Sequence, residues 1–197
     1  MGKKITPAPS KSRMIVGISG ASGAVYGIRL MEALHDVRAE THLIVSKAGG
    51  LTITRETGLT LKAVTAKADV AYAPGDIAAP IASGSFLTHG MVVAPCSIRT
   101  LSEIATGVTS SLLSRAADVT LKERRPLVLV VRESPLHLGH LRTMAALAEM
   151  GAVILPPVPA FYTAPKTVAD IVDQTVARIL DVLGYNWAKA VRWGEGR

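Results

Sequence analysis

The chain has 197 residues but only one cysteine and few aromatic side chains. The single Cys96 excludes a disulfide framework and is typical of a protein from a reducing compartment. Because Phe, Trp and Tyr make up 4% of the residues while 49% are apolar, the core must consist mainly of Ala, Val, Ile and Leu. Five of the eight aromatic residues fall at positions 161–193, so we expect them outside this aliphatic core, at a site or a subunit contact. The apolar content excludes disorder, and the length fits a single domain.

The sequence also lacks a segment suited to crossing a membrane or directing secretion. Its longest run without charge, residues 77–98, is interrupted by Pro80, Gly84, Gly90 and Pro95. The apolar stretch 14–18 is too short for the core of a signal peptide. We therefore expect a soluble, cytoplasmic protein without a membrane partner.

The net charge of +7 is concentrated at the N-terminus. Residues 1–13 contain no acid and four cations, Lys3, Lys4, Lys11 and Arg13, so the rest of the chain carries only +3. This distribution predicts a flexible basic tail at 1–13 and one domain at 14–197. No basic stripe interleaved with aromatic residues follows the tail, so we expect no nucleic-acid partner.

Short runs rich in β-branched residues alternate with longer segments of helical periodicity. We expect strands at 14–18, 41–45, 91–94, 127–131 and 153–155, and helices at 23–35, 48–57, 98–106, 110–122, 138–150 and 167–183. Apolar strands separated by helices indicate an open, mostly parallel sheet with helices on both faces. The predicted fold class is therefore α/β, Rossmann-like or flavodoxin-like, in a single domain.

In such sheets, ligands bind beyond the carboxyl ends of the strands. The segments at those positions are 19–23, 46–47, 95–97, 132–134 and 156–162, and they are rich in hydroxyl groups. In the first of them, Gly20 and Gly23 allow a ligand to approach the backbone, while Ser19 and Ser22 offer hydroxyl donors. The start of the helix at 23–35 favours a phosphate. These features predict an anion site.

A dinucleotide site is disfavoured. The segment after the first strand is neither GxGxxG nor a Walker A loop. In addition, Ser46-Lys47 stands where an NAD site needs an acid for the ribose.

Several polar residues have an ordinary structural explanation beside a functional one. Arg115, Asp118 and Lys122 share one helix face, as surface ion pairs do. Glu56 falls late on a predicted helix, where an exposed side chain is usual.

The potential nucleophile and metal ligands are weak candidates. Cys96 lacks triad spacing, and we expect it to be buried. His137 and His140 have no other ligand-type neighbours, so no metal site is expected. Tyr162, in a Pro-rich loop, is a better candidate for ligand contact, and Trp193 suggests docking on the same or a neighbouring subunit.

Long stretches of the chain resemble the UbiX/Pad-type flavin prenyltransferases, from about residue 14 to residue 195. They are GISGASGAVYG (17–27), SKAG and TRET (within 46–57), ASGSF (82–86), APCSIRTLSEIATG (94–107), RAADVTLKERRPLVLVVRE (115–133), MGAVILPPVPAFY (150–162) and RWG (192–194). The resemblance implies a metal-independent enzyme that joins the dimethylallyl unit of dimethylallyl monophosphate to N5 and C6 of reduced FMN. The product, prenylated FMN, would serve UbiD-type decarboxylases, and the enzyme would be a homo-oligomer, commonly a homo-dodecamer, with sites between subunits.

The same resemblance implies roles for individual residues. Those that would bind FMN are Gly20, Ala21, Ser22, Ser46, Ser97, Ile98, Arg99, Thr100 and Arg132. Those that would surround the dimethylallyl phosphate are Arg115, Lys122, Glu133, Tyr162 and Arg178, and the catalytic set would be Ser22, Glu56, Lys122 and Glu133. Without Mg²⁺, positioned Arg, Lys and Tyr donors must meet the phosphate charge, and a protonated Glu133 would donate as the C–O bond breaks.

The chain departs from the family pattern in three places. Ile77 stands where some members have Trp, and Val131 stands where Pro is usual. The loop after Cys96 reads Ser-Ile-Arg-Thr where Ser-Thr-Gly-Thr is common, and its Arg99 resembles members associated with phenolic-acid decarboxylation. Two alternatives stay open at this point: a flavin-dependent cysteine decarboxylase, and a non-catalytic FMN-binding subunit or flavin carrier.

Overall fold

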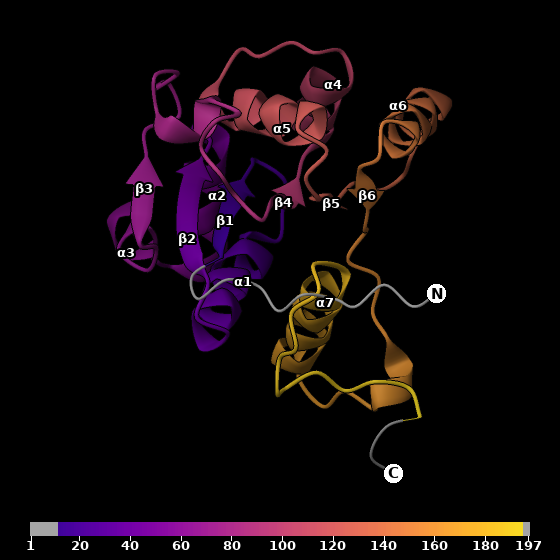
Figure 1. Cartoon of the computed structure of the whole chain (residues 1–197). Coiled ribbons are helices and arrows are strands. Elements are labelled where there is room, and N and C mark those ends of the chain that lie inside the picture. The colour runs from indigo at the N-terminus through magenta and orange to yellow at the C-terminus, as the bar shows by residue number, and fades with distance from the viewer. Residues whose placement is uncertain (1–11, 195–197) are drawn as a thin grey trace, which may run out of the picture.

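A six-stranded parallel sheet forms the centre of the molecule in the computed structural model, which describes residues 12–194 (Figure 1). Its strands are β1 (Arg13–Ile18), β2 (Glu40–Val45), β3 (Val70–Tyr72), β4 (Gly90–Cys96), β5 (Leu127–Val131) and β6 (Val153–Ile154). The spatial order is β3-β2-β1-β4-β5-β6. The chain moves outward from β1 to β3 and then returns to the other side of β1, so the order reverses between β1 and β4. The expected α/β fold is confirmed, and this reversal marks where a ligand is expected.

Helices cover both faces of the sheet (Figure 1). They are α1 (Ala24–Asp36), α2 (Lys47–Thr57), α3 (Leu61–Thr65), α4 (Ile98–Ala105), α5 (Leu112–Lys122), α6 (Leu138–Glu149) and α7 (Val168–Val182), with short 3₁₀ turns η1 (Pro80–Ala82) and η2 (Phe161–Thr163). α1, α2, α3 and α7 bury residues against one face, and α4, α5 and α6 against the other. Hydroxyl side chains cap five of these helices and so define where each begins: Ser46, Thr60, Ser97, Ser111 and Thr167.

The core consists of two apolar clusters, one on each side of the sheet. Met14, Val16 and Ile18 of β1 point into the first cluster, while Ile15 points into the second. This alternation explains why the strands read as apolar on both faces. The expectation that the late aromatic residues lie outside the core is wrong for Trp187, which is 3% exposed and packs in the first cluster.

The edge of the sheet differs from the sequence-based prediction. β3 and α3 were not expected, because β3 has only three residues and α3 five. The Asp69 carboxylate holds the segment before β3 against β2. It accepts hydrogen bonds from the backbone N–H and the hydroxyl of Thr41, both at 2.8 Å. Of the expected basic tail, residues 1–11 lie outside the described residues, and Arg13 is the first residue of β1.

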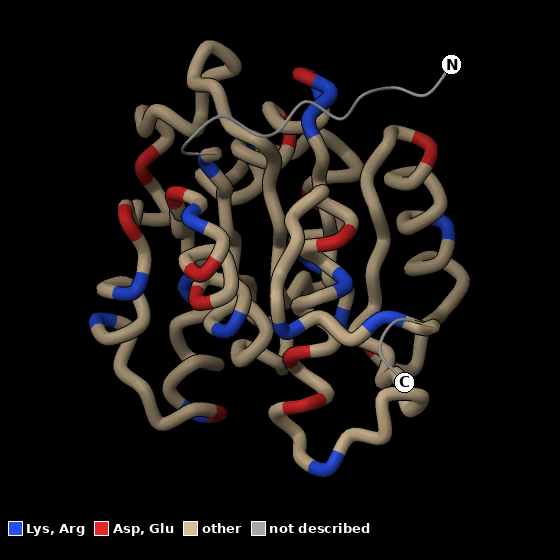
Figure 2. The backbone as a smooth tube through the Cα atoms, turned by 60° about the horizontal axis from the view of Figure 1, so that its bottom comes forward, with Lys and Arg blue, Asp and Glu red and all other residues tan. Residues whose placement is uncertain are grey.

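Charged residues of both signs are interspersed over the described part of the chain (Figure 2). No helix within residues 12–194 is long and apolar enough to span a membrane.

Candidate functional site at the carboxyl edge of the sheet

Three turns meet where the strand order reverses. The turn after β1 contacts the start of α2, since the Ser46 backbone N–H donates to the Ile18 carbonyl at 2.9 Å. It also contacts the start of α4, since the Ser97 backbone N–H donates to the Ser19 hydroxyl at 2.7 Å. The next turn along the edge joins them through the Arg132 backbone N–H and the Cys96 carbonyl, 3.1 Å apart. The segments that the sequence placed beyond the strand ends are therefore neighbours in space.

Close backbone packing explains the glycines in these turns. A Cβ on Gly20 would overlap the Cβ of Ala48 in α2. A Cβ on Gly49 would lie 2.5 Å from the carbonyl oxygen of Ile18. The turn after β1 therefore fits against α2 only because both positions lack side chains.

A cavity of about 560 Å³ opens between these turns. Its lining combines hydroxyl groups, charged side chains and small residues, among them Gly20, Ser46, Lys47, Ser97, Arg99, Thr100, Glu103 and Ser111. The Arg99 side chain is 84% exposed, and its Nε donates to Glu103 at 3.0 Å. Arg99 therefore lies at the rim of the cavity as an added cation and does not fill the interior.

A second cavity, of about 420 Å³, lies beyond the other side of the same turn. Ser22, Gly23, Arg132 and Glu133 line it together with Tyr26 and the segment 156–158. Tyr26 was not predicted as a site residue from the sequence, because nothing distinguishes it from other residues of the helix that α1 forms. Burial raises the pKa of the Tyr26 phenol, although a hydrogen bond with Thr175 and the Arg132 charge oppose this.

Glu56 connects α2 to the start of α1. One of its carboxylate oxygens accepts hydrogen bonds from the backbone N–H groups of Gly23 at 2.8 Å and Ala24 at 3.0 Å. Desolvation would raise the pKa of Glu56, but hydrogen bonds from Ser22 and from these N–H groups outweigh it and hold the pKa below its usual value. A phosphate at the start of α1 would therefore have to displace this carboxylate.

Ser19 does not supply the hydroxyl donor to a ligand that the sequence suggested. The residue is 0% exposed, and its hydroxyl donates to the Pro95 carbonyl at 2.8 Å. Its donor capacity is therefore used inside the protein.

The cations of α5 lie apart from these cavities. Arg115 donates to the Ala82 carbonyl at 3.2 Å and to Asp118 at 2.9 Å, as the ordinary explanation predicted. Lys122 pairs with Glu123 at 2.7 Å. Lys122 ends α5 just before β5, whereas Glu133 follows β5, so the two residues are separated by the length of a strand, roughly 16 Å.

Tyr162 and Trp193 form a further group on the C-terminal part of the chain. Their rings meet edge to face with centroids 5.3 Å apart, and Gln174 of α7 donates to the Tyr162 hydroxyl at 2.9 Å. Trp193 is 81% exposed, and Arg178, one turn beyond Gln174, is exposed as well. One copy of the chain thus brings together Ser22, Glu56, Arg132 and Glu133, but not the whole predicted phosphate set.

The remaining candidates have structural roles. Cys96 is buried as predicted, and desolvation raises the pKa of its thiol to about 12. His137 caps α6 by accepting from the Gly139 backbone N–H at 3.0 Å. No group of three or more His, Cys, Asp or Glu residues suited to a metal occurs among residues 12–194.

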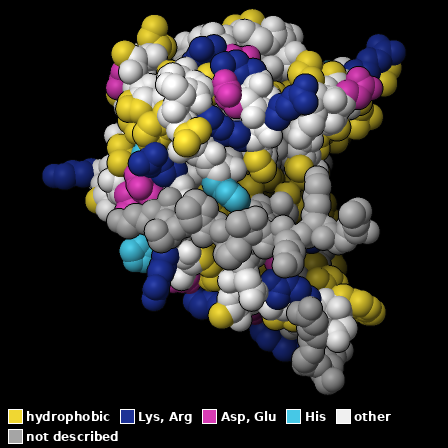
Figure 3. All heavy atoms as spheres, in the orientation of Figure 1, with side chains coloured by type: hydrophobic (Ala, Val, Ile, Leu, Met, Phe, Trp, Pro, Cys, Tyr) yellow, Lys and Arg dark blue, Asp and Glu magenta, His cyan; other side chains and the backbone are white. Residues whose placement is uncertain are grey.

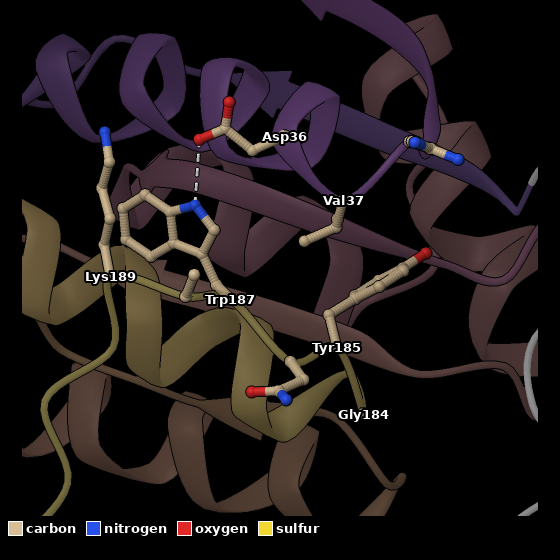
Figure 4. Close-up of a pocket in the computed structure, with 9 residues that line it drawn as sticks. Asp36, Val37, Gly184, Tyr185, Trp187 and Lys189 are labelled. Carbon is tan, nitrogen blue, oxygen red and sulfur yellow. Dashed lines mark hydrogen bonds between the residues drawn. The ribbon is translucent and has the colours of Figure 1, made fainter.

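A larger cavity, of about 650 Å³, lies at the other end of α1 (Figure 4). It is lined by residues 36–38 and 184–189, and the Trp187 indole N–H points to the Asp36 carboxylate, 3.0 Å away. The C-terminal end of α1 that borders it carries the negative end of the helix dipole, which disfavours an anion. Volume alone therefore does not identify the site, and the two cavities at the carboxyl edge are the better candidates.

Comparison with known proteins shows the family of the chain. Residues 5–180 match the family described as Flavoprotein. The flavin prenyltransferase UbiX of Escherichia coli strain K12 is 61% identical over 170 residues, which cover 86% of this chain and 90% of the relative.

Two solved structures share the fold at high similarity. A crystal structure of AnUbiX (PadA1) in complex with FMN and dimethylallyl pyrophosphate superposes with a TM-score of 0.93 at 45% identity, covering 95% of this chain and 100% of that one. A dodecameric FMN-dependent UbiX-like decarboxylase from Escherichia coli O157:H7 gives a TM-score of 0.90 at 50% identity, covering 92% and 98%.

Proposed function

Because the chain belongs to the UbiX-type flavin prenyltransferases of the Flavoprotein family, we propose that it transfers a dimethylallyl unit from dimethylallyl monophosphate to N5 and C6 of reduced FMN. The product, prenylated FMN, serves a UbiD-type decarboxylase. One observation carries this proposal: a hydroxyl-rich cavity lies against the turn after β1, whose Ser22 is hydrogen-bonded to Glu56 of α2 and whose other side faces Arg132 and Glu133.

The chemistry of the larger carboxyl-edge cavity fits FMN. Its volume of about 560 Å³ lies inside the range of about 300–1,000 Å³ usual for small-molecule sites. Hydroxyl groups and cations at its walls match a phosphorylated polyol. The residues that hold FMN in this proposal are Gly20, Ala21, Ser46, Ser97, Ile98, Arg99 and Thr100 at or beside this cavity, together with Ser22 and Arg132 from the second cavity. When bound in reduced form, FMN supplies the nucleophilic N5 and C6 positions.

Ser22 and Glu56 handle the proton released on ring closure. The hydrogen bonds that lower the pKa of Glu56 keep its carboxylate ionised at neutral pH, so it is ready to accept a proton. The Ser22 hydroxyl, hydrogen-bonded to Glu56, faces the second cavity and relays the proton to the carboxylate.

The prenyl phosphate binds at the second cavity. Arg132 supplies charge there, and a protonated Glu133 donates to the phosphate as the C–O bond breaks. Arg115, Lys122, Tyr162 and Arg178 complete the site. Since Lys122 lies a strand length from Glu133 within one copy, we propose that the site forms between subunits. No metal is required, because these donors meet the phosphate charge.

The surface of the chain supports a homo-oligomer, and we propose the dodecamer found for the Escherichia coli O157:H7 relative. α6 exposes 59% of Leu138 and 49% of Leu141, and hydrophobic side chains are visible over this helix (Figure 3). Apolar residues on an exposed helix face are stabilised when a second copy covers them.

The two alternatives are not favoured. The relatives at 51–61% identity are flavin prenyltransferases. A carrier without activity would not need the carboxyl group of Glu133 at the cavity that Ser22 and Gly23 line.

The direct test is a product assay. Purified protein with reduced FMN and dimethylallyl monophosphate should yield a flavin heavier by one C5 unit in mass spectrometry, also after treatment with a chelator. FMN that binds normally but is recovered unchanged would support the carrier instead. Activity that disappears with the chelator and returns with a divalent metal would contradict metal independence.

A further inference from the structure

Ser19 occupies the junction between β1 and β4, where the sheet reverses its order. The regular pairing between these strands runs from Met14↔Gly90 to Gly17↔Val93 and then stops. Just beyond it comes Pro95, which has no backbone N–H and cannot continue a ladder. The two strands must therefore be joined by other groups at the point where their turns form the site.

The Ser19 hydroxyl replaces the missing ladder bond. It donates to the Pro95 carbonyl at 2.8 Å and accepts from the Ser97 backbone N–H at 2.7 Å. The Ser19 backbone N–H adds a bond to the same Pro95 carbonyl at 3.2 Å. With 0% of the residue exposed, water cannot substitute for this hydroxyl without rearrangement.

The two segments that Ser19 joins are the two walls of the cavity proposed for FMN. Gly20 follows Ser19 directly and lines this cavity, and Ser97, which also lines it, is the N-cap of α4, where its own hydroxyl accepts from the Thr100 N–H at 3.3 Å. A rotation of the Ser97 peptide would move the start of α4 relative to Gly20.

We propose that Ser19 is a positioning residue of the flavin site, whose hydroxyl fixes the turn after β1 to the turn after β4 before the ligand binds. This inference rests on the proposed function, because it assigns FMN to the cavity between those turns. Ser19 itself does not contact FMN; it acts through Ser97 and Gly20.

The test compares Ser19→Ala with Thr120→Val, using protein freed of flavin. Thr120 is the matched control because it is 1% exposed and its hydroxyl also makes a buried bond, at 2.7 Å to Ala116 in α5, away from both carboxyl-edge cavities. We expect Ser19→Ala to weaken FMN binding about tenfold or more, since the partly buried Ser97 N–H loses its acceptor. Thr120→Val should lower Tm but leave the FMN dissociation constant within about twofold.

Comparing the change in the KM for FMN with the change in kcat separates a positioning role of Ser19 from general destabilisation. In the prenyl-transfer assay, Ser19→Ala should raise the KM for FMN by more than it lowers kcat, because saturating FMN restores the turn geometry. If the wild type binds FMN and Ser19→Ala binds it equally well, the role assigned to Ser19 is overturned while the proposed function stands. A wild type that binds no FMN would overturn the proposed function and this assignment with it.

A measurement on the unaltered protein covers the case in which Ser19→Ala does not fold. Amide hydrogen exchange of flavin-free wild type should show the Ser97 N–H protected to a degree comparable with the amides of β4. Exchange of the Ser97 amide at the rate of an exposed loop would mean that the bond to Ser19 is not maintained, and would overturn the proposal.

Discussion

The Glu56 carboxylate accepts a hydrogen bond from the backbone N–H of Gly23 at 2.8 Å, although the residues lie 33 positions apart. Glu56 thereby caps α1 from the end of α2, in the place of the side-chain cap that Gly23 cannot provide. The same carboxylate interacts with Ser22, at the wall of the second cavity. The structural cap and the proposed proton acceptor are therefore one group.

Two substitutions of Glu56 should separate these roles. Glu56→Gln keeps an oxygen that can accept from Gly23 and Ala24, whereas Glu56→Ala removes the cap. We expect both variants to lose prenyl transfer by about 10²–10⁴-fold, because neither can accept a proton. Only Glu56→Ala should lose about 1 kcal/mol of stability, measured by urea unfolding. Full activity in Glu56→Gln would show that another group accepts the proton.

The stabilisation from the Glu56 charge should depend on pH. Its folded pKa lies below the ordinary 4.5, so the contribution is complete above about pH 4.5 and is lost as the pH falls through the lower folded value. The stability difference between wild type and Glu56→Gln should therefore shrink between pH 6 and pH 3.5. Because Glu56 is exposed, solvent screening limits the contribution of its charge to the free energy of unfolding to well under about 1 kcal/mol. An exposed carboxylate on α6, changed in Glu149→Gln, serves as the control, and a gap that widens on acidification would contradict the cap.

The close approach of α2 to β1 should make two adjacent glycines respond in opposite ways. Gly49→Ala places a Cβ 2.5 Å from the Ile18 carbonyl oxygen and should cost about 2 kcal/mol or more. Gly50→Ala meets only Leu61 Cδ2, at 3.6 Å, and should stabilise by about 0.5–1 kcal/mol through higher helix propensity. Thermal unfolding of both variants checks this. Similar shifts in Tm would show that the turn after β1 moves at little cost to accommodate the added Cβ.

The fold was predictable because its signals are local. The strand predicted at 127–131 and the helix predicted at 98–106 agree with β5 and α4 to within a residue. Both depend on short-range features of the sequence, namely apolar periodicity and the Ser97 cap. β3 was not predicted because it has only three residues and its position depends on a distant contact. That contact joins Asp69 to Thr41, 28 positions away in the sequence.

The meeting of the turns that form the candidate site was predictable, but their internal contacts were not. Strand ends in a parallel sheet must share an edge, so the turns at 19–23 and 95–97 had to meet. The sequence contains no sign that Ser19 faces inward while Ser22 faces a cavity, because both follow the same strand and differ only in how the turn bends. Glu56 likewise looks like an ordinary helical residue until α1 is placed beside α2.

Glu133→Gln should separate catalysis from binding. Glu133 lines the second cavity, and among residues 12–194 its carboxylate accepts a hydrogen bond only from the neighbouring Ser134 N–H, at 3.1 Å, so little structure depends on it. We expect prenyl transfer to fall by about 10²-fold or more while the FMN dissociation constant changes by less than about twofold. Mass spectrometry of the flavin and FMN fluorescence quenching measure the two effects. Parallel losses of both would reassign Glu133 to a structural role.

The separation of Lys122 and Glu133 predicts complementation between inactive variants. Within one copy, Lys122 precedes β5 and Glu133 follows it, so a site that uses both must take them from different subunits. Lys122→Ala and Glu133→Gln should each be inactive as homo-oligomers. Co-expressed in equal amounts, they should recover about a quarter of the wild-type activity, because random mixing gives that share of sites with both native residues. Mixing the purified homo-oligomers without dissociation is the control and should recover nothing. No recovery in co-expressed, co-purified oligomers would mean that each site draws both residues from one chain or does not use Lys122.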